Sequence, residues 1–559
     1  KVTTLSSINA VGGLFGYYLA HGNFTNCHNN GEIVVAPTGL ASDIQAGGFA
    51  GYFAHRIKTK HFEFSNCSNT KKITFKPGLV NSYARIGGFI GLGTSGASDV
   101  AAGSDTDIYT DCFSSGDLDI AGEGAVSEMY ACSFVGYLSQ GATFTNCYTA
   151  ETVKVDIKTK QITNNVTSGW VGECRQHAGG DKYTLTNCNA YAITTYDSTV
   201  GGAVRFTGLV GGNSAAGTPS GSQTVTVTDC TIKGETHIHG SSNTISYGGL
   251  VRYPYGAGSK YYFTRCTNDC DAYIDATTAA QIEAGGISGY ISATLIVDKD
   301  TKVTADFTAS GKVGSYLAYG GYWGNINHGT LTDKYEGTHS GNITVTGTVG
   351  TSILLGGISA QHKNIVNVDN IVNSGNIYLG TEEKSLTVGS EADNYVRVGG
   401  ISCGGSIGYD DNKLVHELNN VTNTGDIILQ NVNFKMAVDR VWIGGIFGYA
   451  PSSVTGATSH CKIQSGNIPN VGIVMGNARV ADTLDDAGAV SKAGIRAIDC
   501  KVGGTILNEW NDEEQIYEGK TLNSSNFHNY IYGSGRSTDW TGTDNYDGCT
   551  LLASKPTFN

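Results

Sequence analysis

The sequence predicts an all-β protein, a right-handed parallel β-helix (β-solenoid) of about thirteen coils with a C-terminal cap. Three observations predict it. A glycine-rich phrase returns thirteen times at spacings of 27 to 45 residues. Each repeat holds three short segments with strand-like alternation, and helical spacing is nearly absent. The chain also has 78 glycines but only 7 prolines, which indicates many turns or close backbone contacts.

The composition excludes several classes of partner. Only 15% of the 559 residues are charged, the net charge is −13 and the pI is near 5.4. Nucleic acid and anionic membrane surfaces require a basic footprint, and the sequence has no basic stripe. No run of eighteen apolar residues occurs, so we expect no transmembrane segment.

The repeat is marked by the phrase Gly-Gly-x-x-Gly-Tyr, seen most clearly as GGLFGYY and GGFAGYF. Its copies begin at positions 12, 47, 87, 132, 168, 207, 248, 285, 320, 356, 399, 444 and, in a worn form, 471. A propeller blade needs four antiparallel strands with hairpin turns, whereas three strands fit one triangular coil of a β-helix. The variable spacing favours the β-helix, because an insertion at a corner leaves neighbouring coils in register.

The third position of the phrase is almost always a large apolar residue, so we expect it to point inward and stack into a core ladder. These residues are Leu14, Phe49, Phe89, Phe134, Trp170, Leu209, Leu250, Ile287, Tyr322, Ile358, Ile401, Ile446 and Ile473. The fifth position is glycine in nine of the thirteen copies, which predicts a bend or a backbone approach there.

A second ladder is predicted from the phrase FTNC and its copies. It comprises Cys27, Cys67, Cys112, Cys147, Cys188, Cys230 and Cys266, then Ile371, Val421, Cys461 and Cys500. Replacement by Ile and Val predicts that the slot needs an apolar group, which a buried thiol supplies. A disulfide framework is the alternative, but side chains of one ladder share a direction. A zinc site would need repeated CxxC pairs, so we expect no metal and no cofactor. The asparagine before the cysteine is expected to belong to the turn, bonding backbone groups or stacking on its copy.

The repeats define a predicted domain over residues 1–507, followed by a capping segment over 508–559. Open solenoid ends expose unpaired strand groups and core side chains. The first phrase begins at Gly12, so we expect a cap, further domains or a lipid-anchored leader upstream, or a partner that covers this end.

These motifs resemble the GLUG-type β-helix repeats of large surface proteins from the Bacteroides group of bacteria. The resemblance covers roughly residues 10 to 507. It implies export and attachment to the extracellular face of the outer membrane, commonly as a lipoprotein. Adhesion or glycan handling is the function it implies, and it supplies no catalytic residues.

Catalysis is the alternative, because parallel β-helices also host polysaccharide lyases and glycoside hydrolases. Two carboxylate clusters are candidates for acid–base work or calcium binding: Asp105, Asp107 and Asp111, and Asp269, Asp271 and Asp275. Neither is accompanied by a His, Lys or Arg set, so solvated outer faces explain them better. His237 and His239 could share a face, but no third metal ligand is visible.

The sequence therefore favours a non-enzymatic surface protein acting in adhesion, binding of a glycan or protein partner, or surface assembly. The predicted ligand-binding residues are outward-facing aromatics around the phrase, with cover by the chain's own loops as the alternative. They are Tyr17, Tyr52, Tyr137, Tyr253, Tyr290, Trp323 and Tyr449. The fourth position adds Phe15 and Phe447 to the same predicted face.

Overall fold

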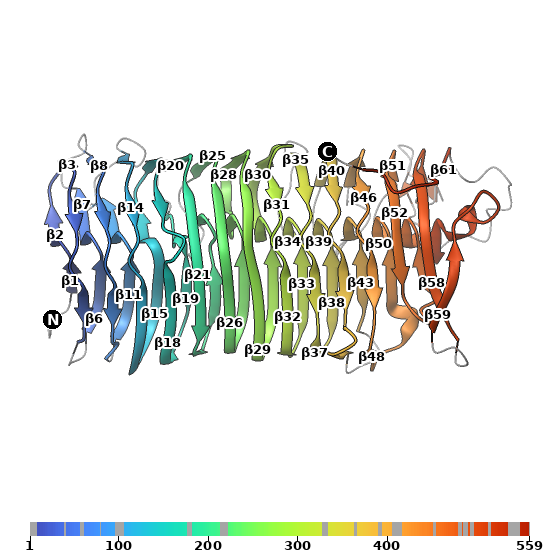
Figure 1. Cartoon of the computed structure of the whole chain (residues 1–559), viewed down its shortest axis with the longest axis horizontal. Helices are drawn as coiled ribbons and strands as arrows, with labels where there is room; N and C mark the ends of the chain where they lie inside the picture. Colours follow the sequence, from blue (N-terminus) through green and yellow to red (C-terminus); the bar gives the residue numbers. More distant parts are fainter. Residues whose placement is uncertain are drawn as a thin grey trace. The chain divides into compact units, whose positions relative to one another are not determined.

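The computed structural model confirms the predicted parallel β-solenoid, in which equivalent strands of neighbouring coils pair in parallel (Figure 1). It describes residues 8–37, 41–55, 61–78, 80–95, 106–175, 181–212, 222–326, 334–362, 366–389, 394–404, 416–450, 454–478, 483–484, 490–491, 497–511, 516–534 and 548–557. The chain forms two compact units, residues 1–280 with 286–296 and residues 281–285 with 297–559. Each unit is described by itself below.

In the first unit, each coil runs through a strand before the phrase, a strand after it, a strand before the FTNC corner and strands beyond that corner. Strands before the phrase are β1 (Ile8–Gly12), β6 (Ala41–Gly47), β11 (Val80–Gly87), β15 (Leu118–Ser139), β19 (Val166–Val171), β23 (Ala203–Phe206) and β26 (Thr231–Gly248). Strands after it are β2 (Phe15–Leu19), β7 (Ala50–His55), β12 (Ile90–Ser95), the end of β15, β24 (Val210–Gly211), β27 (Val251–Arg252) and β30 (Ser288–Val297). The corner is preceded by β3 (Gly22–Thr25), β8 (Phe62–Ser65), β13 (Asp107–Thr110), β16 (Ala142–Thr145), β20 (Asp181–Thr186), β25 (Gln223–Thr228) and β28 (Tyr255–Thr264). It is followed by β4 (His28–Asn29), β5 (Ile33–Val35), β9 (Ser68–Asn69), β10 (Ile73–Phe75), β14 (Phe113–Ser114), β17 (Tyr148–Thr149), β18 (Lys154–Ile162), β21 (Asn189–Asp197), β22 (Thr199–Val200) and β29 (Thr267–Gly285).

The second unit repeats this order. Strands before the phrase are β33 (Tyr316–Gly320), β38 (Ser352–Gly356), β43 (Val396–Gly399), β49 (Val441–Gly444) and β53 (Asn470–Gly472). Strands after it are β34 (Trp323–Ile326), β39 (Ser359–His362), β44 (Ser402–Gly404), β50 (Phe447–Ala450), β54 (Met475–Ala478) and β60 (Tyr532–Ser534). The corner is preceded by β35 (Lys334–His339), β40 (Val366–Asn373), β45 (His416–Asn419), β51 (Val454–Thr455) and β57 (Ala497–Ile498). It is followed by β46 (Thr422–Asn423), β52 (Thr458–Gln464), β58 (Lys501–Asn511) and β61 (Thr550–Leu551). The remaining elements are β31 (Lys302–Val303), β32 (Phe307–Val313), β36 (Ile343–Val345), β37 (Gly347–Val349), β41 (Ile377–Leu379), β42 (Leu386–Val388), β47 (Ile427–Leu429), β48 (Val432–Phe434), β55 (Thr483–Leu484), β56 (Val490–Ser491), β59 (Ile516–Thr521) and the 3₁₀ helices η2 (Val438–Arg440) and η3 (Phe527–Tyr530).

The phrase copies stack in register. In the first unit Gly47 pairs with Gly12 on one side and Gly87 on the other. In the second, Gly320, Gly356, Gly399 and Gly444 form a continuous parallel series. The third position builds the expected core in the first unit beyond its first copy, because Phe89 stacks on Phe134 with ring centroids 5.2 Å apart and Phe134 stacks on Trp170 at 4.9 Å. Leu14, in the first copy, was expected to point inward but is 43% exposed.

The worn copy is shifted by one residue from its predicted alignment. Gly444 pairs with Gly472, so the counterpart of Ile446 is Val474 rather than Ile473. The stack then continues, since Met475 pairs with Tyr532 inside the segment predicted to be a cap. The predicted boundary at residue 507 falls within β58, which forms an antiparallel hairpin with β59.

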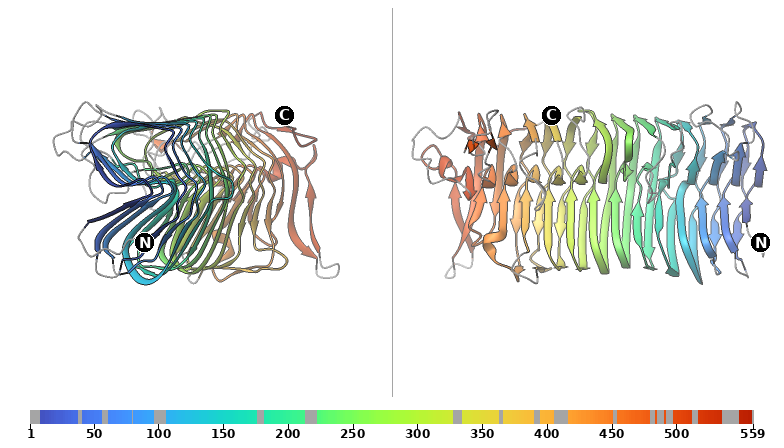
Figure 2. Two further views of the ribbon diagram at one scale, coloured as in Figure 1. Left: turned by 60° about the vertical axis from the view of Figure 1, so that its left-hand side comes forward. Right: turned by 180° about the vertical axis from the view of Figure 1, so that it is seen from behind.

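The two glycines of the phrase allow a sharp turn in each coil (Figure 2, left). A Cβ on Gly47 would lie 2.0 Å from the carbonyl oxygen of Ala50. A Cβ on Gly48 would lie 2.1 Å from the carbonyl oxygen of Gly88 and 2.2 Å from Cγ of Asn69. Glycine is therefore required at Gly47 by contacts within the coil and at Gly48 by contacts with the neighbouring coil.

Candidate functional site

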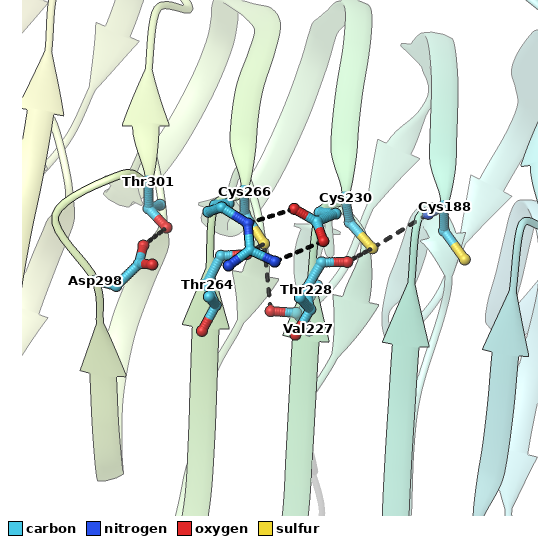
Figure 3. Close-up of polar contacts among 10 residues, drawn as sticks. Cys188, Val227, Thr228, Cys230, Thr264, Cys266, Asp298 and Thr301 are labelled. Carbon is cyan, nitrogen blue, oxygen red and sulfur yellow. Dashed lines mark hydrogen bonds and ion pairs between the residues drawn. The ribbon is translucent and has the colours of Figure 1, made fainter.

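The predicted cysteine ladder is confirmed as packing. All fourteen cysteines are free, and all except the half-buried Cys27 are buried. Cys230 accepts a hydrogen bond of 3.3 Å from the backbone N–H of Cys188, and its thiol donates to the Thr228 carbonyl at 3.2 Å (Figure 3). Burial raises the pKa of the Cys147 thiol well above its usual range, so the group stays protonated.

One member of this ladder was assigned wrongly. The ladder residue always follows a corner residue with positive φ, and in this coil that residue is Gly456 with φ of 67°. Ala457 therefore occupies the slot predicted for Cys461, while Cys461 lies further along β52, paired with Gly504. The ladder also continues beyond Cys500 to Cys549, which follows Gly548 with φ of 78°.

The asparagine before each ladder residue is confirmed as a turn residue. Asn26, Asn66, Asn146 and Asn187 have φ between 51° and 54°, a left-handed conformation that Asn tolerates better than most residues. The side chains also bond along the stack, since Asn66 Nδ2 donates to Asn26 Oδ1 at 2.6 Å and Asn187 Nδ2 donates to Asn146 Oδ1 at 2.8 Å. Asp229 and Arg265 replace two of these asparagines and form a bidentate ion pair at 2.6 and 2.7 Å.

The predicted aromatic residues fall into two groups by exposure. In the first unit Tyr17 is 51% exposed and stacks on the half-buried Tyr52 at 4.5 Å. Tyr253 and Tyr290, also half-buried, stack at 4.6 Å with an interplanar angle of 16°. In the second unit Tyr449 is half-buried.

Trp323 and Tyr137 are far less accessible than the sequence suggested. Trp323 is 0% exposed and Tyr137 is 7% exposed. The alternation argument fails because the fourth position points into the core: Phe447 is 0% exposed, and Phe15 packs on Phe49 and Phe24. Phe53, at the seventh position, is buried as well. Side chains at the fourth and seventh positions therefore both point into the core, so the alternation of inward and outward side chains is interrupted around the glycine at the fifth position. At this turn the side chain of the sixth position points away from the core.

The sixth position faces side chains that lie two residues before the phrase, and we call these two rows the inner face. Tyr130 is such a residue, and its ring contacts the ring of Tyr137 edge-on at 5.2 Å. Arg85, in the same row as Tyr130, lies with its guanidinium 5.0 Å from the Tyr137 ring centre and 3.7 Å from Asp43. The inner face thus brings together residues from separate repeats.

A cluster of charged residues occupies the inner face of the first unit. The hydroxyl of Tyr130 lies 3.0 Å from Glu128 Oε1 and 3.0 Å from Glu173 Oε2. It carries one proton, so it donates to one of these carboxylates at a time. Arg205 Nη1 lies 3.9 Å from Glu128 Oε1, and both side chains are 14% exposed. Burial and the charge of Glu173 raise the pKa of Tyr130 well above its usual range, so its hydroxyl is a proton donor.

Arg252 adjoins this cluster and departs from the repeat in two ways. It occupies the fifth position, where most copies have glycine, and pairs with Gly211 of the preceding coil. The next residue, Tyr253, has φ of 59°, which is rare for an aromatic residue. Burial, together with the like charge of Arg205, lowers the pKa of Arg252 to about 9.

The inner face of the second unit is built around another arginine. Arg397 is 1% exposed, and its guanidinium lies 4.1 Å from the ring centre of Tyr449, 4.9 Å from that of Tyr395 and 5.5 Å from that of Trp442. These are cation–π contacts, which are strongest when they are desolvated. Tyr449 therefore packs against the guanidinium of Arg397, while part of the Tyr449 side chain stays accessible.

The first predicted carboxylate cluster is separated by the structure. Asp105 lies outside the described residues. Asp107 is completely buried and accepts a 2.9 Å hydrogen bond from the Phe62 N–H, whereas Asp111 is an exposed corner residue with φ of 54°. Asp107 thus has a structural role, because its carboxylate satisfies a buried backbone group.

The second carboxylate cluster meets the two predicted histidines on an outer face. Asp269, Asp271 and Asp275 all avoid the core. His239 Nδ1 lies 3.4 Å from Asp275 Oδ2, and His237 stacks on Tyr273 at 4.8 Å. Within the part of the chain that the structure describes, no group of three or more His, Cys, Asp or Glu residues could hold a metal ion.

The charged cluster and the adjoining Arg252 were missed because these residues come from four repeats and form no local motif. One signal was present in the sequence, since Arg252 interrupts the fifth glycine in the phrase GGLVRYP. No protein-family model, curated protein or solved structure matches this chain. Among the described residues, no helix has the length and apolar character needed to cross a membrane.

Proposed function

We propose that this protein is a non-enzymatic cell-surface β-solenoid that binds a glycan along the inner face of its first unit. The observation that carries the proposal is the arrangement of the stacked pairs Tyr17–Tyr52 and Tyr253–Tyr290 on the same inner face as the charged cluster. Accessible aromatic rings offer large contact area at a small entropic cost, and charged groups between them supply hydrogen bonds.

The stacked rings also explain why this face would hold an extended ligand. The members of each pair lie one coil apart, and parallel strands are spaced by about 4.8 Å. A polymer that follows the stack would meet successive rings. The role of the solenoid in this proposal is to hold the rings in register, because their backbone positions are fixed by parallel pairing.

The proposal is tested by measuring binding of the purified chain to a panel of neutral and acidic polysaccharides. Tyr52→Ala and Tyr290→Ala should each weaken binding about fivefold to tenfold, the size expected from the loss of one aromatic contact. Tyr148→Ala is the matched control, because Tyr148 is 40% exposed and stacks on Phe113 at 5.0 Å but lies beyond the FTNC corner. Equal effects of all three variants, or no binding by the unaltered chain, would contradict the proposal.

Surface localisation, through a lipid anchor or a larger assembly, forms part of the proposal and depends on the resemblance to GLUG-type surface proteins. It is tested by adding protease to intact cells that produce the full-length natural protein. Cleavage before lysis is expected, and protection until the outer membrane is opened would contradict surface display.

A polysaccharide lyase or glycoside hydrolase remains the second candidate function. The observation that favours it is the contact of one tyrosine hydroxyl with two glutamates, since paired carboxyl groups are the usual acid–base set of glycosidases. Release of reducing ends or unsaturated products from any polymer of the panel, abolished by Glu173→Gln, would establish the enzyme and overturn the non-enzymatic proposal.

A further inference from the structure

We infer that Arg252, assisted by Arg205, binds the negatively charged group of an acidic glycan, a carboxylate or a sulfate. This inference rests on the proposed function and adds the chemical class of the ligand. Its first support is the state of Arg252 itself. The side chain is 7% exposed, yet it forms no hydrogen bond or ion pair with any residue that the structure describes.

A buried guanidinium without an anion is costly, because its hydration is lost and nothing replaces it. Among the described residues, the Arg252 guanidinium lies over the Tyr253 ring, whose centre is 5.2 Å away. The Nε atoms of both Arg252 and Arg205 are buried without a hydrogen-bond partner in the described part of the chain. Glu173 attracts the charge of Arg252 from nearby, but the ion pair of this cluster at 3.9 Å joins Arg205 to Glu128.

The repeat supplies an independent argument. A solenoid needs the same structural residues in each coil, and the fifth position is glycine in ten of thirteen copies once the last copy is aligned by its pairing with Gly444. Arg252 and the strained Tyr253 therefore serve no purpose that stacking requires. Residues that lower stability without a structural role indicate a functional site.

The position of the pair suits a ligand held by Tyr253 and Tyr290. Arg205 keeps 14% of its side chain exposed, so an anion can approach the two guanidinium groups from outside. Tyr253 contributes both to the ring pair and to the contact with Arg252. Guanidinium groups bind carboxylate and sulfate oxygens through paired N–H donors. This chemistry identifies a negatively charged oxygen group as the ligand, but it does not distinguish a carboxylate from a sulfate.

The experiment compares two matched pairs of polymers. Polygalacturonate is compared with its fully methyl-esterified form, and dextran sulfate with dextran. We expect the unaltered chain to bind at least one acidic member tenfold or more tightly than its neutral partner, and this preference to weaken as salt rises. A preference in the first pair only would identify a carboxylate as the ligand, and in the second pair only a sulfate. The net charge of −13 makes non-specific attraction of a polyanion unfavourable.

Three variants separate the site from its surroundings. Arg252→Gly restores the residue that the repeat normally has, so it should keep or raise Tm while it removes the acidic preference. Arg205→Ser introduces the residue found at its register partner Ser246 and should weaken acidic binding threefold or more. Arg265→Asn is the control, because it also replaces an arginine with the usual residue of its position, at the corner, and should leave binding unchanged.

Equal binding of acidic and neutral polymers, unaffected by Arg252→Gly, would overturn this inference while the tyrosine test of the proposed function still stood. Binding of none of the four polymers would also overturn it, and the wider panel would then decide the proposed function separately. A sharp fall in Tm for Arg252→Gly, with anion binding unchanged in Arg205→Ser, would show that the arginines are structural and would likewise overturn it.

Discussion

The side-chain amide of Asn373 donates a hydrogen bond of 2.8 Å to the amide oxygen of Asn423, one coil further along the second unit. Both side chains are buried, and each also donates to a backbone carbonyl, of Gly375 and Gly425 respectively. They form a buried polar ladder two residues beyond the cysteine position. His339 begins this ladder, with Nδ1 2.7 Å from Asn373 Oδ1.

The first prediction concerns the pH dependence that His339 adds to the second unit. Its Nε2 is buried without a hydrogen-bond partner in the described structure, and burial lowers the pKa of His339 to about 4 from 6.5. The His339 side chain binds a proton more readily in the unfolded chain than in the folded one. Burial of the neutral imidazole therefore makes its full contribution to stability above pH 6.5, and this contribution is lost as pH falls toward 4. The loss should reach about 3 kcal/mol.

Urea unfolding at pH 7 and pH 4.5, followed by a probe in the second unit, measures this loss. His339→Asn introduces the residue present in the next two coils and is the control for other titrating groups. The variant should show a smaller difference between the two pH values, and an identical difference in both proteins would contradict the assignment to His339.

The second prediction concerns the close approach at the phrase. Gly48→Ala should destabilise the first unit by about 3 kcal/mol or more, because the new Cβ would overlap the Gly88 carbonyl and Asn69. Gly22→Ala is the control, since its Cβ would find its nearest atom, the Tyr18 hydroxyl, at 3.5 Å. Thermal unfolding followed by circular dichroism gives both values, and comparable Tm values for the two variants would refute the packing requirement.

A third prediction follows from the cysteine ladder. Cys147 is completely buried, so Cys147→Ser should cost about 1 to 3 kcal/mol, because it places a more polar hydroxyl in the apolar slot. Cys147→Val should be milder, as Ile371 and Val421 fill the same slot in other coils. Denaturant unfolding compares them, and a serine variant as stable as the valine variant would argue against an apolar slot.

Thiol labelling gives a fourth prediction without mutation. In native protein Cys27 should react first, since it is the one cysteine that is not buried, and the other thirteen should react only after unfolding. Alkylation followed by mass spectrometry measures the order. A set of sites that never reacts, even in denaturant without reductant, would indicate disulfides and contradict free thiols.

The corner asparagines give a fifth prediction. Asn146 has φ of 54°, so Asn146→Ala should destabilise the first unit by about 1 kcal/mol through backbone strain, whereas Asn146→Gly should cost less. The difference between these variants isolates the backbone contribution, because both lose the bond to Asn187 Nδ2. Equal unfolding midpoints would contradict a strained corner.

The sequence was sufficient for the fold and for most structural ladders, because repetition aligns equivalent residues without knowledge of the structure. Phe89 and Phe134 could be placed in the core in this way. The same reasoning failed where local geometry interrupts the repeat. Phe447 and Trp323 were placed outside, since strict alternation cannot show that a strand changes sides at a turn.

The charged cluster could not be predicted for a different reason. Tyr130, Glu173 and Arg205 acquire their meaning from contacts between coils, and each is an isolated polar residue in its own repeat. The Arg252 position was recognisable as an exception to the fifth glycine, but the lack of a hydrogen-bond partner for its buried Nε among the described residues became visible only with the surrounding side chains in place. Departures from the repeat are the residues to examine first in such chains.

The contact of Gly48 with the carbonyl of Gly88 has a consequence for how chains of this kind can change in length. It joins equivalent residues of adjacent coils, as does the bond from Asn29 Nδ2 to Asn69 Oδ1. Removal of residues 48–87 would join Gly47 to Gly88 and regenerate the phrase Gly-Gly-Phe-Ile-Gly from two different copies. Asn29 would then face Ser114, another polar member of its ladder. The coil is therefore a unit of excision and duplication, and the gain or loss of a whole copy leaves the interfaces between the remaining copies chemically equivalent.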